Sequence, residues 1–364
     1  MKSPGATRAR APASKHKVCR EVKDMTSKER CLAVLHREKP DRVPYFPLTM
    51  FFAADRAGLN FREYATCPAA LAEAQLLQYE RYRVDAVTVC SDAFRISADL
   101  GAQMVFPENQ TPFAARPLIG DPADLGRLKA PDPMRPGSRM RQRIESVEIL
   151  ARSVGKEALV CGWVEMPFAE VCDWFGVQEL MFLMMDEPGL VHQALEMIVE
   201  MEIEFARCQL EAGADIIGCG DSAASLISAA HFREFALPYE QRVTEGIRAA
   251  GGLSKLHICG NTTHSLPLLA QCGADMVNID AQVDFDLAVR VFGDAGMSFK
   301  GNADPVRDLM NATPHQARAK GEELVRKARG LPFMLSAGCE IPAATKDETM
   351  MAFSLAAITS GGAS

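Results

Sequence analysis

The triplet His257-x-Cys259 carries the strongest local signal for chemistry in this sequence. It ends a short apolar run, 255–259, which predicts a buried β-strand. Residues two apart in a strand point to the same face, so the imidazole and the thiol can reach one ion. Gly260 and Asn261 predict a turn directly afterwards, which puts the pair at the carboxyl end of the strand. A core histidine beside a core cysteine is the competing interpretation of the triplet alone.

A further thiol and a carboxylate follow two other predicted strands. Cys339 stands just after the run 333–337, and Asp280 ends the run 275–279. If the carboxyl ends of these strands meet at one mouth, as in a closed barrel, both side chains can join the His257–Cys259 pair. A His/Cys/Cys set with one carboxylate is a plausible tetrahedral site, and soft thiolate ligands favour zinc over magnesium or calcium.

The elements that must position these residues alternate between strand and helix patterns. Periodic segments such as 191–210 and 314–329 predict helices, and Thr313-Pro314 predicts a helix start. This alternation predicts an α/β fold, and eight βα units in about 300 residues favour a (β/α)8 TIM barrel. A doubly wound sheet is the rival. The eight predicted strands lie at 43–48, 86–90, 158–164, 214–219, 255–259, 275–279, 297–301 and 333–337.

The chain is expected to form one domain, a barrel over residues 25–364. Residues 1–24 carry a net charge of +5 and no apolar core of a secretory signal, so they predict a disordered basic extension. A transit peptide or an over-called start codon are the alternatives, because Met25 precedes a good helix start with Thr26 or Ser27 as cap. Residues 101–145, rich in Pro and Arg, predict an insertion near the barrel mouth.

Composition narrows the class of protein. The 364 residues are 48% hydrophobic and 24% charged with a net charge of −7, which is typical of a globular chain and gives no reason to expect nucleic-acid binding. No apolar stretch reaches the roughly 18 residues of a membrane span. The eleven cysteines are an odd number and lie mostly in apolar runs, which predicts a reducing, cytoplasmic location rather than a disulfide scaffold.

Several blocks of sequence resemble a known family. From about Met25 onward the chain resembles the uroporphyrinogen decarboxylase superfamily and, within it, the zinc-dependent, corrinoid-linked methyltransferases of the methylcobamide:coenzyme M methyltransferase type. The His-x-Cys pair with a distant Cys is the mark of that branch. The matching blocks are Ser27-Lys28-Glu29-Arg30, Glu38-Lys39-Pro40-Asp41-Arg42-Val43-Pro44, Gly220-Asp221, Leu226-Ile227-Ser228, Phe232-Arg233-Glu234-Phe235, Pro238-Tyr239, His257-Ile258-Cys259-Gly260-Asn261, Gly301-Asn302-Ala303-Asp304-Pro305 and Ser336-Ala337-Gly338-Cys339-Glu340-Ile341-Pro342.

The resemblance implies a TIM barrel, a zinc ion held by His257, Cys259 and Cys339, and a fourth ligand at Asp280, where relatives often have Glu. It also implies a methylated corrinoid as co-substrate. No D-x-H-x-x-G run for binding a corrinoid is present, so the corrinoid is expected on a small partner protein. Two thiolates largely neutralise Zn²⁺, which suits the ionisation of a thiol acceptor better than hydrolysis.

Other reactions stay open at this point. Relatives in the same branch run the opposite half-reaction and take a methyl group from a methoxy or methylamine-type donor. Uroporphyrinogen decarboxylases resemble a different pattern after the first strand, R-Q-A-G-R, whereas this chain has Pro47-Leu48-Thr49-Met50-Phe51-Phe52 and lacks the arginines for a poly-anionic substrate. A barrel that binds a ligand without turnover is the alternative outside enzymes.

Five further residues follow predicted strands and are candidates for substrate binding. Each also has a structural interpretation: Trp163 as core, Asp304 as a helix cap before Pro305, and a buried carboxylate such as Asp221 as a paired group. The candidates are Trp163, Asp221, Asn302, Asp304 and Asp92.

Overall fold

The computed structural model describes residues 24–362. The predicted basic extension, residues 1–24, lies outside the described residues except for Asp24. The expected helix start after Met25 is confirmed, because helix α1 spans Ser27–Leu35. The Thr26 side chain accepts a hydrogen bond from the backbone N–H of Glu29, and the Glu29 side chain accepts one from the backbone N–H of Thr26, which forms a capping box.

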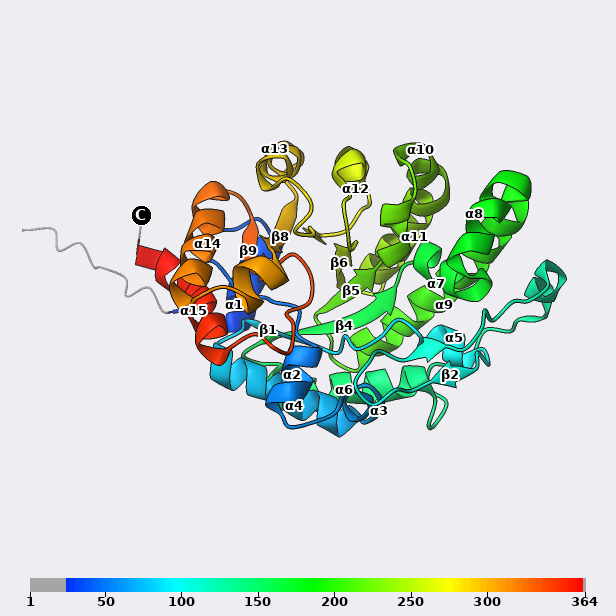
Figure 1. The fold of residues 1–364 in the computed structure, drawn as a ribbon, viewed down its shortest axis with the longest axis horizontal. Coiled ribbons are helices and arrows are strands. Elements are labelled where there is room, and N and C mark those ends of the chain that lie inside the picture. The colour runs from blue at the N-terminus through cyan, green and yellow to red at the C-terminus, as the bar shows by residue number, and fades with distance from the viewer. Residues whose placement is uncertain (1–23, 363–364) are drawn as a thin grey trace, which may run out of the picture.

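The centre of the fold is a curled sheet of seven parallel strands (Figure 1). Its strands follow chain order from one edge to the other, without the reversal of order that a doubly wound sheet has. A separate two-stranded antiparallel ribbon pairs β2 with β3. The seven strands are β1 (Ala86–Thr88), β4 (Leu159–Glu165), β5 (Ile216–Gly220), β6 (Leu253–His257), β7 (Met276–Asn278), β8 (Ser298–Ala303) and β9 (Phe333–Ala337), and the ribbon consists of β2 (Met104–Val105) and β3 (Phe113–Ala114).

Seven of the eight predicted strands are confirmed as members of this sheet, and the predicted strand at 43–48 is not a regular strand. That segment makes isolated parallel bridges, Tyr45 to Leu335 and Leu48 to Glu340. Pro44 and Pro47 explain the difference, because proline has no N–H to donate to a ladder. The fold is therefore α/β with a curled, seven-stranded parallel sheet.

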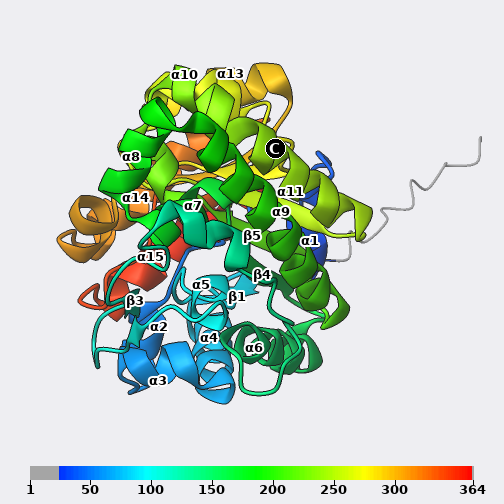
Figure 2. The same cartoon turned by 90° about the vertical axis from the view of Figure 1, so that its right-hand side faces the viewer.

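Helices surround the outer face of the curled sheet (Figure 1). The turned view shows α4 and α6 side by side below β1 and β4 (Figure 2), and these two helices contact each other. The helices after α1 are α2 (Phe51–Arg56), α3 (Phe61–Thr66), α4 (Pro68–Tyr82), α5 (Ile96–Asp99), α6 (Arg139–Val154), α7 (Pro167–Phe175), α8 (Val177–Asp186), α9 (Pro188–Glu211), α10 (Ala229–His231), α11 (Leu237–Ala249), α12 (Leu266–Leu269), α13 (Phe285–Ala295), α14 (Pro314–Lys327) and α15 (Asp347–Ile358). Short 3-10 or π turns lie at η1 (Pro122–Arg127), η2 (Ser222–Leu226), η3 (Phe232–Ala236), η4 (Thr263–Ser265), η5 (Pro305–Met310) and η6 (Thr359–Gly362).

The predicted insertion at 101–145 is shorter in the structure. Helix α6 begins at Arg139, because the Ser138 side chain accepts a hydrogen bond from the backbone N–H of Arg141 and caps it. The segment before it holds the β2–β3 ribbon and η1, and it connects the carboxyl end of β1 to α6. It therefore belongs to the end of the sheet at which the strands' carboxyl termini lie.

The inside of the curled sheet is filled in layers. An apolar layer that includes Phe46, Ile216, Met276 and Met334 lies toward the amino ends of the strands. Above it, the buried ammonium groups of two lysines lie over the Phe46 ring, Lys300 at 4.3 Å and Lys255 at 5.2 Å from the ring centroid. Among residues 24–362, none of the helices combines the length and the apolar character that crossing a bilayer requires.

Candidate metal centre

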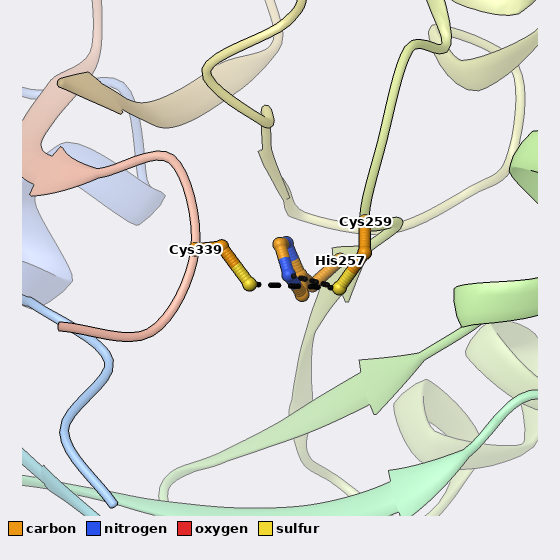
Figure 3. Close-up of side chains that lie close together, drawn as sticks. All are labelled: His257, Cys259 and Cys339. Carbon is orange, nitrogen blue, oxygen red and sulfur yellow. Dashed lines mark hydrogen bonds between the residues drawn. The ribbon is translucent and has the colours of Figure 1, made fainter. Parts of the chain in front are cut away.

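Three side chains that could bind a metal meet at the carboxyl ends of β6 and β9 (Figure 3). The Cys259 sulfur lies 3.2 Å from His257 Nε2 and 3.6 Å from the Cys339 sulfur. One ligand atom from each of the three residues lies within 4.8 Å of the other two. The predicted convergence of His257, Cys259 and Cys339, two of them 80 residues apart, is therefore present in the geometry.

Local backbone features set these positions. His257 is the last residue of β6, and the chain turns at Gly260, whose φ of +89° favours glycine. Cys339 follows β9 by way of Gly338, where a Cβ atom would overlap the backbone nitrogen of Ala281. Glycine at 338 thus lets the Cys339 loop pack directly against the loop that follows β7.

The donor set fits zinc in spacing and in chemistry. With zinc bonded at about 2.3 Å to sulfur and about 2.0 Å to nitrogen, tetrahedral angles separate two sulfurs by about 3.8 Å and a sulfur from a nitrogen by about 3.5 Å. The distances of 3.6 Å between the sulfurs and 3.2 Å from Cys259 Sγ to His257 Nε2 lie within a few tenths of these values. Two thiolates and one imidazole are ligands that zinc prefers.

A carbonyl on the neighbouring strand orients the imidazole. His257 Nδ1 lies 3.2 Å from the backbone oxygen of Asn278, the last residue of β7. Because a carbonyl accepts, Nδ1 carries the proton and Nε2 presents its lone pair to the two sulfurs. This is the arrangement in which a histidine ligand is held by a group behind it.

The two sulfurs lie within hydrogen-bonding distance, which moves the pKa values of the two thiols in opposite directions. The hydrogen bond from the Cys259 thiol lowers the pKa of Cys339 to about 3, and His257 lowers that pKa further against the effect of burial. The same hydrogen bond, together with burial and the Cys339 charge, raises the pKa of Cys259. A cation at the centre would displace the thiol protons that remain.

Asp280, predicted as a fourth ligand, is not one of the residues in the close set. Its Oδ1 accepts a hydrogen bond from the backbone N–H of Gln282, and it is 6% exposed. Asn302 donates from Nδ2 to the backbone oxygens of Asp280 and Val283, at 3.1 and 2.8 Å. Asn302 therefore holds the loop that carries Asp280. Metal binding by Asp280 and substrate binding by Asn302 both stay predictions.

Two other candidates lie on β4 and directly after β5, the two strands that precede β6 in the sheet. Trp163 is buried on β4, and its indole N–H donates to Glu165 Oε1 at 2.8 Å. Asp221 follows β5, and its backbone N–H donates to the His257 carbonyl at 2.9 Å. Burial raises the pKa of the Asp221 carboxyl to about 7, beside the carboxyl of Glu240. A substrate contact of either residue stays a prediction.

The last two candidates use their carboxylates within the protein. Asp92 is held by Arg95 at 3.0 Å and by Arg139 at 2.8 and 2.9 Å. Burial would raise the pKa of Asp92, but these arginines hold it well below its usual range. Asp304 caps η5, since its Oδ1 accepts from the backbone N–H groups of Val306 and Arg307. Substrate binding by either residue stays a prediction.

Two acidic residues near the centre were missed from the sequence. Glu340 Oε1 accepts from the backbone N–H groups of Met50 and Phe51, which ties the Cys339 loop to the start of α2. Glu165 ends β4 on the inner face, beside Trp163. The sequence feature that could have identified Glu165 is the alternation of Trp163 and Glu165 along β4, opposite the small residues Gly218 and Gly220 of β5.

A separate cavity of about 830 Å³ lies at the opposite end of the fold. It is bounded by the segment 37–43 and by the ends of α14 and α15, near the amino end of β9. The cavity therefore does not belong to the candidate metal centre.

Comparison with known proteins gives the family context. A family model described as "Uroporphyrinogen decarboxylase (URO-D)" matches residues 26–359. The methylcobamide:CoM methyltransferase MtbA of Methanosarcina mazei is 28% identical over 338 residues, 88% of this chain and 94% of that protein. A uroporphyrinogen decarboxylase of Synechococcus sp. (strain CC9605) is 28% identical over 306 residues, 81% of this chain and 84% of that protein.

Solved structures agree on the fold. A methyltransferase from Methanosarcina mazei superimposes with a TM-score of 0.84 and 25% identity, covering 92% of this chain and 98% of that one. A B12-independent methionine synthase from Shewanella sp. W3-18-1 has a TM-score of 0.54 at 12% identity, which indicates a similar fold alone.

Proposed function

Because the chain belongs to the uroporphyrinogen decarboxylase family and has methyltransferase enzymes among its relatives, we propose that it is a zinc-dependent methyltransferase. It would move a methyl group between a corrinoid, carried on a small partner protein, and a small molecule bound at the metal centre. The observation that carries this proposal is the convergence of His257, Cys259 and Cys339 at the carboxyl ends of β6 and β9.

These three side chains would hold the metal, and a zinc ion there would lower the pKa of a thiol bound at its remaining position. The Asn278 carbonyl keeps His257 Nε2 facing the sulfurs. Glu340 keeps Cys339 in place through its two backbone hydrogen bonds at the start of α2. Asp280, on the loop that Asn302 holds, is the proposed fourth ligand. The substrate pocket would include Trp163, Asp221, Asn302, Asp304 and Asp92.

A thiol is the first candidate for the methyl acceptor. It is supported by the names of similar proteins, the methylcobamide:CoM methyltransferases MtbA and MtaA, the latter 26% identical over 343 residues. A soft sulfur ligand also suits a cation that already has two thiolates. The corrinoid would have to approach from the carboxyl ends of the strands, where the centre lies.

Decarboxylation of a poly-anionic porphyrinogen is disfavoured by charge. The side chains beside the centre that carry ionisable groups include Glu165 and Glu340, and no arginine replaces the missing R-Q-A-G-R pattern at 47–52. A substrate with many carboxylates would therefore lack the counter-charges that such arginines supply. A barrel without turnover is disfavoured because the complete set of three metal-binding side chains is present.

A methyl-donor:corrinoid reaction, with a methoxy or methylamine-type donor, is the second candidate. It is favoured by Glu165, a buried carboxyl beside the centre whose pKa burial raises well above its usual value. An uncharged acid can protonate a leaving heteroatom but cannot accept the proton of a thiol.

Two finer points accompany the proposal. The segment 43–48 would complete an eight-stranded barrel, supported by its bridges to β9 and by the hydrogen bond from Asp85 N–H to the Tyr45 carbonyl.

A cytoplasmic location is supported by ten cysteines among the described residues that are all free.

The function is tested by metal analysis and by a transfer assay. The purified chain should contain about one zinc per molecule and should demethylate methylcobalamin with a panel of thiols. Cys259→Ser should lower zinc content and reduce transfer by at least about 100-fold, since one of three protein ligands is lost. Cys272→Ser, a buried cysteine away from the centre, is the matched control. Full turnover of Cys259→Ser, or active protein without zinc, would contradict the proposal.

A further inference from the structure

The carboxyl group of Glu165 lies in the same row of the sheet as the metal-binding histidine. Glu165 pairs with Gly220 across β4 and β5, and Gly220 pairs with His257 across β5 and β6. The two Cα atoms are thus two strand spacings apart, roughly 10 Å. A Cβ at position 220 would overlap Glu165 Oε2, so the glycine leaves room for the carboxyl over β5, between β4 and His257.

One oxygen of this carboxyl is fixed and the other is free. The Trp163 indole N–H donates to Oε1 at 2.8 Å, and Trp163 itself is held from behind by the Lys255 ammonium, 4.5 Å from its ring centroid. No hydrogen bond between residues 24–362 uses Glu165 Oε2. Glu165 is 8% exposed, so its carboxyl is not completely enclosed.

The surroundings raise the pKa of this carboxyl. Burial is the largest influence and raises the pKa of Glu165, and the nearby acids Glu170 and Asp173 raise it further. Arg143 opposes this effect, but its guanidinium donates to the backbone oxygens of Trp163 and Asp92 rather than to Glu165. The ionisable groups around Glu165 are Arg143 from α6, Glu170 and Asp173 from α7, Glu202 from α9, Lys255 below Trp163, and Cys259 beyond β6.

Two other buried acids differ from Glu165 in their setting. Glu170 is 1% exposed and accepts from the Ser97 hydroxyl at 2.7 Å, and Glu202 is fully buried. Both lie on helices, α7 and α9, rather than on the inner row of the sheet. Of these three acids, Glu165 is thus the one whose carboxyl lies in the row of the sheet that contains His257 and has an oxygen without a hydrogen bond.

We propose that Glu165 is the proton donor of this site: it passes its proton from the free carboxyl oxygen to the oxygen atom of a methyl ether as the methyl group leaves. This inference rests on the proposed function and, within it, on the second candidate reaction, in which a methyl group moves from a methoxy donor to the reduced corrinoid of the partner. The bond between oxygen and the methyl carbon breaks, and the corrinoid cobalt(I) supplies the electron pair of the new cobalt–carbon bond. The proton of Glu165 goes to the leaving oxygen, which leaves as an alcohol or phenol, and Glu165 is left ionised.

Leaving-group basicity explains why oxygen needs such a donor. A phenol, with a pKa near 10 as in tyrosine, is a poorer leaving group as its anion than a thiol, with a pKa near 8.5. A positioned acid contributes about 10²–10⁴-fold to such a step. A thiol acceptor would instead release a proton, which a carboxyl that is already protonated cannot take up.

The protonation of Glu165 can be tested without turnover. Infrared spectra of the zinc-loaded full-length protein at neutral pH, in H₂O and D₂O, should contain a carboxylic-acid carbonyl band that Glu165→Gln removes. Glu170→Gln, the matched buried control, should remove a different band. A Glu165→Gln spectrum that loses only a carboxylate band would overturn the proposal, because the residue would then be ionised at rest.

The catalytic role is tested with a methoxybenzene series and cob(I)alamin as probes. Glu165→Gln should lower demethylation by about 10²-fold or more, with larger losses for the more basic leaving phenols, and should lower thiol methylation by methylcobalamin much less. In the wild type kcat/KM should fall as pH rises through the raised pKa of Glu165, and the variant should lack that fall.

The outcomes separate this inference from the function on which it rests. Equal losses across the whole methoxybenzene series would overturn the proton-donor role. A wild-type protein that methylates thiols but demethylates none of the methoxybenzenes would overturn the assigned direction and keep the methyltransferase. A protein that binds no zinc and transfers no methyl group in either assay would remove both.

Discussion

At the scale of single residues, the chemistry of the centre depends on side chains whose positions are fixed by their neighbours. His257 and Cys259 could be paired from sequence because strand alternation is local. Cys339 could be added to the pair because it follows a predicted strand. Glu165 could not be assigned in this way. Its environment depends on the absence of a side chain at Gly220, a residue on the next strand, 55 positions later in the sequence.

Glu340 offers a test of positioning beside a ligand. Glu340→Gln should keep the fold but weaken the two hydrogen bonds to Met50 and Phe51, so that the Cys339 loop is held less firmly. We expect zinc affinity to fall about 10-fold, within the range for groups that support a ligand. Competition with a chromogenic chelator measures this affinity.

The control for this variant is Asp304→Asn, which keeps a helix cap at the exit of β8. The Asp304 carboxylate accepts hydrogen bonds from the backbone N–H groups of Val306 and Arg307 rather than from the Cys339 loop. If both variants bind zinc as the wild type does, Glu340 does not position the ligand.

At the scale of elements, seven of the eight strands that periodicity predicted are present in the sheet, and the exceptions have local causes. The strand expected at 43–48 lacks a regular ladder because Pro44 and Pro47 cannot donate, and the start of α6 was missed because its Ser138 cap lies inside a Pro- and Arg-rich stretch. Which side chains fill the inner face could not be predicted, because that depends on the pairing of neighbouring strands. Trp163 illustrates this, since its ring lies over Gly218 of β5.

Gly218→Ala tests that packing. The added Cβ would overlap the Trp163 indole ring, which is rigid, so the free energy of unfolding should fall by about 1–3 kcal/mol. Urea denaturation measures the loss. Gly189→Ala is the control: its Cβ meets nothing within 4 Å near the start of α9, and it should change stability by less than about 1 kcal/mol. Equal stability of the two variants would exclude a close Trp163–Gly218 contact.

At the scale of the whole molecule, the fold buries several acids without full compensation. Burial raises the pKa of Glu170 to about 8, of Asp173 and Asp221 to about 7, and of Glu340 to about 8. A sequence can indicate that acidic residues follow strands, as it did for Asp221. It cannot indicate how deeply each is enclosed, because burial results from the packing of α7, α9 and α11 on the sheet.

These raised pKa values predict how stability depends on pH. Between about pH 5 and pH 8 the folded chain retains protons that the unfolded chain has released, so the free energy of unfolding should fall as pH rises. Asp92, whose pKa is lowered, is ionised in both states across this range and does not contribute there. Urea denaturation of the metal-free protein at a series of pH values measures the slope.

Glu170→Gln should make this slope shallower by up to about 1.4 kcal/mol per pH unit, because it removes one of the titrating groups. Glu179→Gln, an exposed residue at the start of α8, should leave the slope as it is. A stability that rises over this interval in the wild type would mean that these acids are ionised in the folded protein.

The spacing of the proposed metal ligands along the chain also has a consequence for biosynthesis. A ribosome-bound chain would expose His257 and Cys259 long before Cys339 is made, since 80 residues separate the two sulfurs. Until then, the nascent polypeptide could offer a metal ion only two of its three protein ligands. Metallation would thus be among the last events of maturation, and an incomplete translation product would be unable to retain the ion.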